Sequence, residues 1–255
     1  MNSKIKNWRG QRVWVIGASS GIGAETARKL LARGATLALS ARNAAGLQQI
    51  ANGHADTLIL PLDITDHASV VSAHKQLLEE WGVIDLVLIV AGTYNKMRAD
   101  NFDLSVAKQL LEINLNGTLN CLDAVLPTLL KQGQGGLGIV SSVAGFRGLP
   151  ESLIYGPTKA ALINLCEALY LDLRPRGINV YLINPGFVAT PLTAKNDFAM
   201  PALISAAEAA NQLIRGIERG EFHIHFPKRF TNWLRVTSLL PYRSYFWLIH
   251  KVTGL

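Results

Sequence analysis

Short apolar runs alternate with amphipathic stretches along the chain. The apolar runs are rich in Val, Ile and Leu and are bounded by Gly, Pro, Asp or Asn, which is typical of strands buried on both faces. The stretches between them follow the helical period, and Thr65 or Asp66 would cap one of these helices. This order predicts an α/β fold with a doubly wound parallel sheet and helices on both faces. The predicted strands are residues 12–17, 36–41, 56–62, 85–92, 137–142 and 179–186.

A glycine-rich turn, GASSGIG, follows the first predicted strand. Sheets of this kind bind ligands at the carboxyl ends of their strands. Gly17, Gly21 and Gly23 would let the backbone turn sharply and approach a ligand, while the first N–H groups of the next helix attract a pyrophosphate. Glycine also serves ordinary strand-to-helix turns, so the motif gains weight from its place in the first βα unit.

The second predicted strand ends in SAR, which places Arg42 where a dinucleotide site would meet the adenosine ribose. NAD sites favour an acidic side chain at this point, whereas an arginine can pair with the 2′-phosphate of NADP. The residue therefore favours NADP(H), with NAD(H) as the alternative. A solvated charge at the start of a helix is the competing interpretation.

A tyrosine and a lysine stand four positions apart in YGPTK. Pro157 is suited to the first turn of a helix, so a helix is predicted to begin near Tyr155 and to place Lys159 on the same face. A nearby positive charge favours phenolate and would lower the pKa of the phenol, which suits proton transfer. Such pairs also occur on ordinary solvated helix faces, and the spacing alone leaves both interpretations open.

The composition indicates one domain that is more apolar than usual. The chain has 255 residues, 49% hydrophobic and 17% charged, so either its core is large or apolar surface meets a partner. Cys121 and Cys166 form no disulfide framework, which favours a reducing, cytoplasmic compartment. No apolar run approaches the roughly 20 residues of a membrane helix. No metal site is expected, since the six histidines (54, 67, 74, 223, 225 and 250) lack ligand spacing.

Taken together, GASSGIG, NLNG, SSVAG, YGPTK and NPGFVAT occur in the order and spacing typical of one enzyme family. Over roughly residues 10 to 220 the chain resembles the short-chain dehydrogenase/reductase family, in the branch with a Tyr-x-x-x-Lys active site. The resemblance implies a Rossmann-type sheet of about seven strands. It also implies a catalytic tetrad of Asn114, Ser142, Tyr155 and Lys159, with Ser142 thirteen residues before Tyr155.

The resemblance further implies a set of cofactor contacts. Asp63 corresponds to an aspartate that contacts adenine, and the segment after residue 184 to one that holds the carboxamide and diphosphate. Two departures from the family pattern weaken polar anchors: Ile16 replaces a threonine, and Ile89 and Val90 replace two asparagines. The implied contacts are Gly17, Ser19, Ser20, Gly21, Ile22, Gly23, Arg42, Asp63, Ile64, Ala91, Gly92, Tyr155, Lys159, Pro185, Gly186, Val188 and Thr190. A basic residue common in the turn of NADP-preferring members is Ser20 here, so the NADP preference depends on Arg42.

A mechanism follows from the resemblance. Lys159 would hold the nicotinamide ribose and keep positive charge near Tyr155, which would exchange a proton with the substrate oxygen while Ser142 orients that oxygen. Hydride would pass between the nicotinamide and a carbonyl or alcohol carbon. Asn114 would join Lys159 through water, or pair with backbone in a kinked helix, or do both. A homo-oligomer, dimer or tetramer, is expected of this family.

The segment after Pro191 resembles the family's substrate lid, near residues 190–220. Leu192, Phe198, Met200 and Leu203 are apolar there, so a lipophilic small-molecule substrate is predicted. Residues 222–255 then extend the catalytic domain (1–221) with basic and aromatic residues and no acidic one. Two interpretations remain open: peripheral contact with an anionic membrane, or an edge strand at 222–227 followed by helices packed within the subunit or oligomer. No nucleic-acid-binding motif occurs, and no such partner is expected.

Two other function classes compete with the dehydrogenase. A dinucleotide-sensing binding protein would share the fold, but it need not keep Ser142, Tyr155 and Lys159 together. A sugar-nucleotide epimerase of the longer related branch would carry a larger C-terminal domain and a differently spaced glycine motif. The sequence favours neither.

Overall fold

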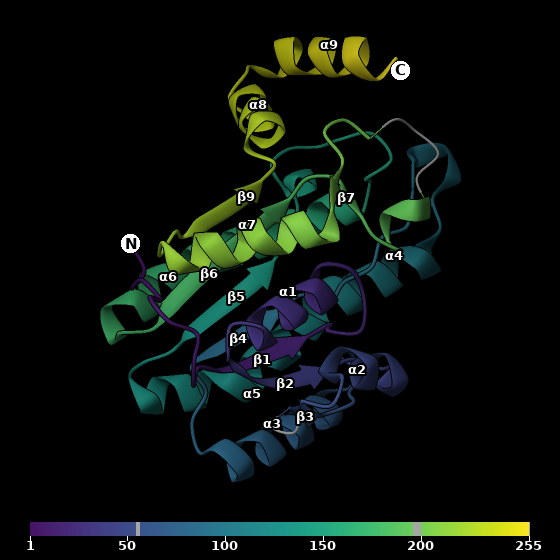
Figure 1. Cartoon of the computed structure of the whole chain (residues 1–255). Helices are drawn as coiled ribbons and strands as arrows, with labels where there is room; N and C mark the ends of the chain where they lie inside the picture. The colour runs from purple at the N-terminus through teal and green to yellow at the C-terminus, as the bar shows by residue number, and fades with distance from the viewer. Residues whose placement is uncertain (55–56, 196–199, 255) are drawn as a thin grey trace.

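The computed structural model describes residues 1–54, 57–195 and 200–254. Its centre is a parallel sheet of seven strands in the order β3-β2-β1-β4-β5-β6-β9, shown in Figure 1. The predicted fold is confirmed. The strands are β1 (Arg12–Ile16), β2 (Thr36–Ser40), β3 (Leu58–Ile59), β4 (Leu86–Ile89), β5 (Gly136–Val140), β6 (Asn179–Pro185) and β9 (His223–Phe226), with β7 (Val188–Ala189) and β8 (Ile204–Ser205) forming a separate short ribbon.

Helices cover both faces of the sheet because its strands are apolar on both sides. Along β1, Val13 and Val15 belong to one core cluster while Trp14 and Ile16 belong to the other. The first face is covered by α1 (Gly21–Leu31), α2 (Ala44–Ala51) and α7 (Ala206–Glu218). The second is covered by α3 (His67–Trp81), α5 (Gly117–Gln132) and α6 (Tyr155–Leu173).

Local signals set where these helices begin. Asp66 caps α3 by accepting hydrogen bonds from the N–H groups of Ala68 and Ser69, and α6 begins at Tyr155 with Pro157 in its first turn. The long helical stretch after residue 104 is not continuous. Helix α4 (Leu104–Leu111) is separated from α5 by a π-helical turn, η2 (Glu112–Asn116).

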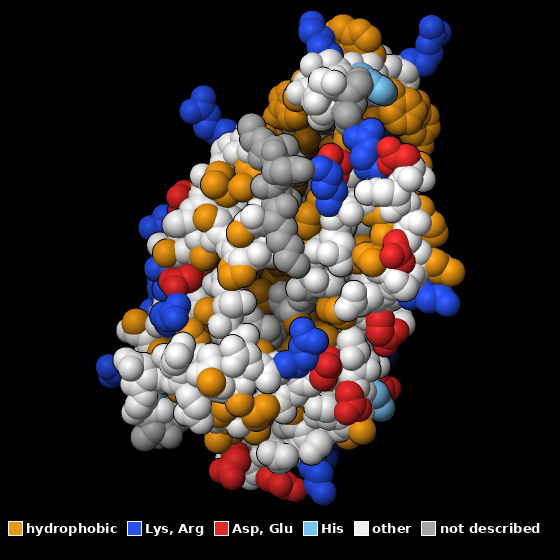
Figure 2. Space-filling model, turned by 90° about the vertical axis from the view of Figure 1, so that its right-hand side faces the viewer, with side chains coloured by type: hydrophobic (Ala, Val, Ile, Leu, Met, Phe, Trp, Pro, Cys, Tyr) orange, Lys and Arg blue, Asp and Glu red, His pale blue; other side chains and the backbone are white. Residues whose placement is uncertain are grey.

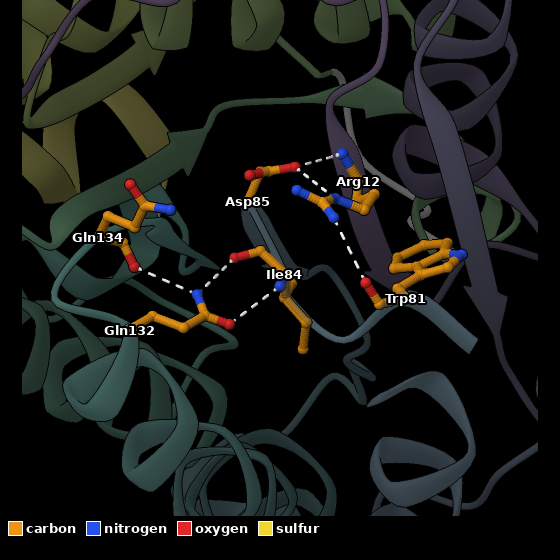
Figure 3. A network of polar contacts seen from close by, with 6 residues as sticks. All are labelled: Arg12, Trp81, Ile84, Asp85, Gln132 and Gln134. Atoms are coloured by element: carbon orange, nitrogen blue, oxygen red, sulfur yellow. Dashed lines mark hydrogen bonds and ion pairs between the residues drawn. The ribbon is translucent and has the colours of Figure 1, made fainter. Parts of the chain in front are cut away.

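The amino ends of β1 and β4 are held by a polar network on the side of the sheet opposite the strands' carboxyl ends (Figure 3). The Arg12 N–H and Nε both donate to Asp85 Oδ2, at 2.8 and 3.0 Å. The Gln132 side chain pairs with both backbone groups of Ile84, which attaches the end of α5. These hydrogen bonds connect β1, β4 and α5 at the amino ends of the strands. The opposite, carboxyl ends of the strands are not part of this network.

The C-terminal segment leaves the sheet after its edge strand. β9 pairs with β6, as the interpretation with an edge strand predicts. Two further helices, α8 (Lys228–Ser238) and α9 (Tyr242–Thr253), lie beyond the sheet at the top of Figure 1. Within the described residues, no helix has the length and apolar character required to cross a membrane.

Candidate active site

A cavity of about 450 Å³ opens at the carboxyl ends of β1, β4 and β5. All residues predicted to contact the cofactor line it, from Gly17 in the glycine turn to Thr190 after β7. Three of the four predicted catalytic residues, Ser142, Tyr155 and Lys159, line it as well, whereas Asn114 does not. The fold therefore brings these distant motifs to one place.

The glycine turn is packed too closely to admit side chains. Gly17 has φ +96°, and a Cβ added there would lie 2.5 Å from the backbone nitrogen of Ala91. At the start of α1, the Ser20 side chain makes no capping hydrogen bond. The first N–H groups of α1 therefore lack a side-chain cap and suit the anionic pyrophosphate of a dinucleotide.

The two departures from the family pattern are compensated by backbone and packing. The Ile16 carbonyl accepts hydrogen bonds from the N–H groups of Val90 and Ala91, at 2.8 and 3.0 Å. Ile16 and Ile89 are both fully buried in the second core cluster. Apolar packing and main-chain pairing thus join the ends of β1 and β4 where polar side chains were expected.

Arg42 and Asp63 stand at the adenosine end of the cavity. Arg42 Nη1 lies 3.9 Å from Asp63 Oδ2, and the arginine side chain is 73% exposed. Asp63 accepts hydrogen bonds from the N–H and hydroxyl of Thr65, and the N–H bond is the main reason that the pKa of its carboxyl is lowered. The loose contact leaves the guanidinium able to turn toward an anionic ligand.

Tyr155 and Lys159 do not form a solvated surface pair. Lys159 is 3% exposed, its Nζ donates to the Val140 carbonyl at 3.1 Å, and it lies 5.7 Å from the centre of the Tyr155 ring. The half-buried tyrosine stacks edge-on against Tyr94, with ring centres 5.0 Å apart. The pair therefore faces the cavity from the first turns of α6.

Burial, and not the charge of Lys159, governs the pKa of the Tyr155 phenol in this geometry, so the expected lowering of that pKa is not observed. Burial raises the pKa of Tyr155 to about 12, and hydrogen bonding to Ser142 opposes this only in part. Burial also lowers the pKa of Lys159 to about 8. Desolvation acts on both groups and disfavours both charges, so at neutral pH the tyrosine is a neutral phenol ready to donate a proton.

Asn114 lies in the π-helical turn and is fully buried. Its Oδ1 accepts from the Thr93 N–H at 2.8 Å, and its Nδ2 donates to the Thr93 carbonyl and the Thr158 hydroxyl. A Cβ on Gly92 would touch both Asn114 Oδ1 and Lys159 Nζ, so the amide and the ammonium lie beside the same glycine. The expected backbone pairing is confirmed, while the water relay stays a prediction.

Serine side chains join β5 to α6. Ser142 caps the short helix η3 (Val143–Gly145) by accepting from the Ala144 N–H at 3.1 Å. Ser141 donates to the carbonyl of Lys159 at 2.6 Å, which fixes the lysine backbone against the end of β5. Sequence reasoning missed Ser141 and several other cavity residues, although they directly adjoin predicted ones: Asn43, Thr93, Ile113 and Thr193.

A second cavity, of about 620 Å³, adjoins the first and shares lining residues with it, among them Ser142 and Tyr155. Its walls are mostly apolar and include Leu192 and Met200 from the predicted lid. Leu203, also expected there, is instead 45% exposed, and Phe198 lies outside the described residues. The tail contributes an unforeseen wall from α8 and α9: Phe230, Trp233, Leu234, Ile249, Val252 and Thr253.

The tail is attached to the loop that follows Ser142. Arg147 Nη1 donates to the carbonyls of Ser238 and Leu240, at 2.9 and 2.6 Å, between α8 and α9. The guanidinium also lies 4.1 Å from the centre of the Tyr245 ring, and the Tyr245 hydroxyl donates to the Gly148 carbonyl. These contacts couple the position of the tail to the wall of the second cavity.

Burial also shifts the pKa of two histidines and two cysteines that line neither of these cavities. His223 and His225 lie in β9, and burial lowers the pKa of each to about 4, so both are neutral near pH 7. Cys121 and Cys166 are buried, which raises the pKa of each thiol to about 12. Among the described residues no cluster of side chains is suited to hold a metal ion.

Comparison with known proteins identifies a family model that matches most of the chain. The family model described as short chain dehydrogenase matches residues 11–200. An uncharacterized oxidoreductase from Myxococcus xanthus is 35% identical over 231 residues, which cover 89% of this chain and 91% of the relative. An uncharacterized oxidoreductase from Staphylococcus epidermidis is 33% identical and covers 78% of this chain and 87% of its own.

Solved structures agree in fold. A short chain dehydrogenase/reductase from Burkholderia phymatum in complex with NAD has a TM-score of 0.83 at 21% identity, covering 91% of this chain and 94% of that one. An alcohol dehydrogenase from the archaeon Thermococcus sibiricus, complexed with 5-hydroxy-NADP, has a TM-score of 0.77 at 25% identity. The match covers 86% of this chain and 96% of that one.

Proposed function

The chain belongs to the short-chain dehydrogenase family, an NAD(P)-dependent group of oxidoreductases, and from this premise we propose its reaction. It transfers a hydride between NADP(H) and a carbonyl or secondary alcohol of a lipophilic small molecule, with Tyr155 as the acid or base. The observation that carries the proposal is the junction of two cavities at Ser142 and Tyr155. One cavity suits a dinucleotide and the other an apolar substrate.

The residues of the first cavity fit a nicotinamide dinucleotide. The glycine turn leaves room for backbone approach, and the uncapped start of α1 suits a pyrophosphate. Lys159 lines the same cavity, where an ammonium donor suits the ribose hydroxyls. When bound there, the nicotinamide supplies or accepts the hydride.

Side chains of the protein supply the proton and orient the substrate oxygen. In reduction, the neutral phenol of Tyr155 donates its proton to the substrate oxygen as negative charge develops on it, and its raised pKa keeps it protonated until then. The Ser142 hydroxyl donates to the same oxygen and orients it. Lys159, with a pKa near 8, is largely protonated at neutral pH and favours the phenolate that remains.

The preference for NADP(H) rests on Arg42. Its exposed guanidinium can turn toward a 2′-phosphate, because the ion pair that it forms with Asp63, at 3.9 Å, is loose. The cavity still contains Asp63, which could accept from a 2′-hydroxyl, so NAD(H) is the weaker alternative cofactor.

A substrate panel tests the proposed function. Purified protein would be mixed with NADPH and a series of ketones and aldehydes of increasing apolar size, and the loss of reduced nicotinamide absorbance followed. The reverse reaction with secondary alcohols and NADP⁺, and both directions with NADH and NAD⁺, complete the panel. We expect kcat/KM to rise with apolar size and to be higher with NADPH. No turnover of any member, despite cofactor binding, would instead support a dinucleotide sensor.

A further inference from the structure

The outer face of α8 and α9 is apolar and exposed. Relative exposure is 84% for Leu239, 70% for Tyr242, 63% for Trp247 and 55% for Phe246. Tyr242, Phe246 and Trp247 belong to α9, and Leu239 directly follows α8; Figure 1 places both helices beyond the sheet. Exposed apolar surface of this kind typically marks a site where the protein binds a partner or a membrane.

The charge of the segment identifies the occupant. Residues 222–255 contain five lysines and arginines and no acidic residue. Arg229, Arg235, Arg243 and Lys251 are all exposed. Figure 2 shows blue side chains around orange ones at the top of the molecule, where Figure 1 places α9. Exposed Trp and Tyr beside Lys and Arg match the interface of an anionic bilayer, where aromatics sit at headgroup depth.

The exposed face is continuous with the second cavity. Trp233 and Val252, from α8 and α9, line that cavity and are 39% and 59% exposed. The rim of the cavity therefore adjoins the apolar surface. A second copy of this chain would cover apolar residues equally well, but it would bring the same predominantly basic segment against itself.

We propose that the outer face of α8 and α9 docks on an anionic membrane surface and that the lipophilic substrate enters the second cavity from the bilayer. Docking stands on its own observations, whereas substrate access rests on the proposed function. The helices lie on the surface and do not cross it. Binding combines apolar insertion with a charge attraction that salt screens.

Vesicle co-sedimentation tests the docking without using turnover. The full chain would be mixed with vesicles of phosphatidylcholine alone or of phosphatidylcholine with phosphatidylglycerol, at low and high salt. We expect binding to the anionic vesicles and its loss at high salt. The double variant Arg243→Gln with Lys251→Gln should weaken partitioning roughly 30-fold, from about fivefold per basic residue. Lys75→Gln on α3 is the matched control and should bind normally.

A second comparison of variants tests how much the apolar side chains contribute to vesicle binding. Leu239→Ser with Trp247→Ser should reduce binding at both salt concentrations, whereas Leu171→Ser, which changes another highly exposed leucine, on α6, should not. NADPH binding serves as the check that each variant is folded. Absence of vesicle binding, or unchanged binding in both tail variants, would overturn the proposal. A dimer that dissociates in the Leu239 and Trp247 variant would also overturn it, because a second copy would then occupy the face.

Discussion

The glycine turn and the C-terminal helices bound the same site but are built differently. At the turn, Gly17 packs against the Ala91 backbone so closely that no side chain fits, and the strands on either side are fully buried. At the tail, α8 and α9 bury few residues and are attached by side-chain contacts, among them those of Arg147, Tyr245 and Thr231. The cofactor end is therefore fixed by backbone geometry, whereas the substrate end is held by contacts between side chains.

This difference predicts that substitutions at the two ends of the site have different effects. Changes at the carboxyl ends of the strands should damage stability, cofactor binding or chemistry. Changes at the tail should act on the substrate, and on a membrane if the docking proposal holds. The residue at the junction, Tyr155, should affect chemistry alone. Five changes probe these expectations, in decreasing order of effect.

Tyr155→Phe removes the transferable proton and little else. Turnover should fall by about a hundredfold to ten-thousandfold, the usual contribution of general acid–base catalysis, with NADPH affinity nearly unchanged. Steady-state kinetics measure the turnover, and a fluorescence titration measures the affinity for NADPH. Turnover close to that of the unmodified chain would remove Tyr155 from the mechanism.

Gly17→Ala introduces a Cβ at φ +96° and 2.5 Å from the Ala91 nitrogen. We expect a loss of about 2–3 kcal/mol in the free energy of unfolding, from strain and overpacking together. Gly148→Ala is the control, because a Cβ there meets nothing within 4 Å. Urea denaturation of both variants makes the measurement, and equal stability would show that the turn is less rigid than its contacts indicate.

Lys159 should make stability depend on pH. Its pKa falls from 10.5 to about 8 on folding, so the unfolded chain binds more protons between these values and stability rises with pH across that window. Relative to Lys159→Met, the unmodified chain should gain about 2–3 kcal/mol between pH 8 and pH 10.5. Parallel denaturation curves at several pH values test this. A constant difference between the two proteins would mean that the ammonium is not desolvated.

Arg42→Ala should weaken NADPH binding roughly tenfold and leave NADH almost unchanged, because the lost interaction is a charge-assisted bond to the 2′-phosphate. Because the Arg42 side chain is exposed to solvent, the expected loss of NADPH affinity lies at the lower end of the range for charge-assisted hydrogen bonds. Titration with both cofactors decides the matter. Equal losses would assign Arg42 a structural role and leave the NADP preference unsupported.

Arg147→Ala should have the smallest effect and the most selective one. Without the two bonds to Ser238 and Leu240, the tail should close less well over the second cavity. We expect KM for a lipophilic substrate to rise a few-fold, with kcat and NADPH affinity preserved, and partial recovery with Arg147→Lys. A fall in kcat without a change in KM would contradict a role in positioning the substrate wall.

The same contrast explains what could be predicted from the sequence. The glycine turn, the strand ends and the YGPTK helix use contiguous residues and local backbone rules, so their places were predictable. The wall formed by Trp233, Ile249 and Val252 depends on how α8 and α9 pack, which no local pattern encodes. The direction of the Tyr155 pKa was also missed, because desolvation depends on burial, and burial is a property of the whole fold.

The central claim is that hydride passes from the nicotinamide to a substrate carbon while Tyr155 supplies the proton. The most direct test uses NADPH deuterated at the transferable position of C4, a lipophilic ketone and mass analysis of the alcohol formed. The account predicts deuterium at the former carbonyl carbon with the unmodified protein and no labelled alcohol with Tyr155→Phe on the same timescale. An alcohol formed without deuterium, or labelled equally fast by the variant, would contradict it.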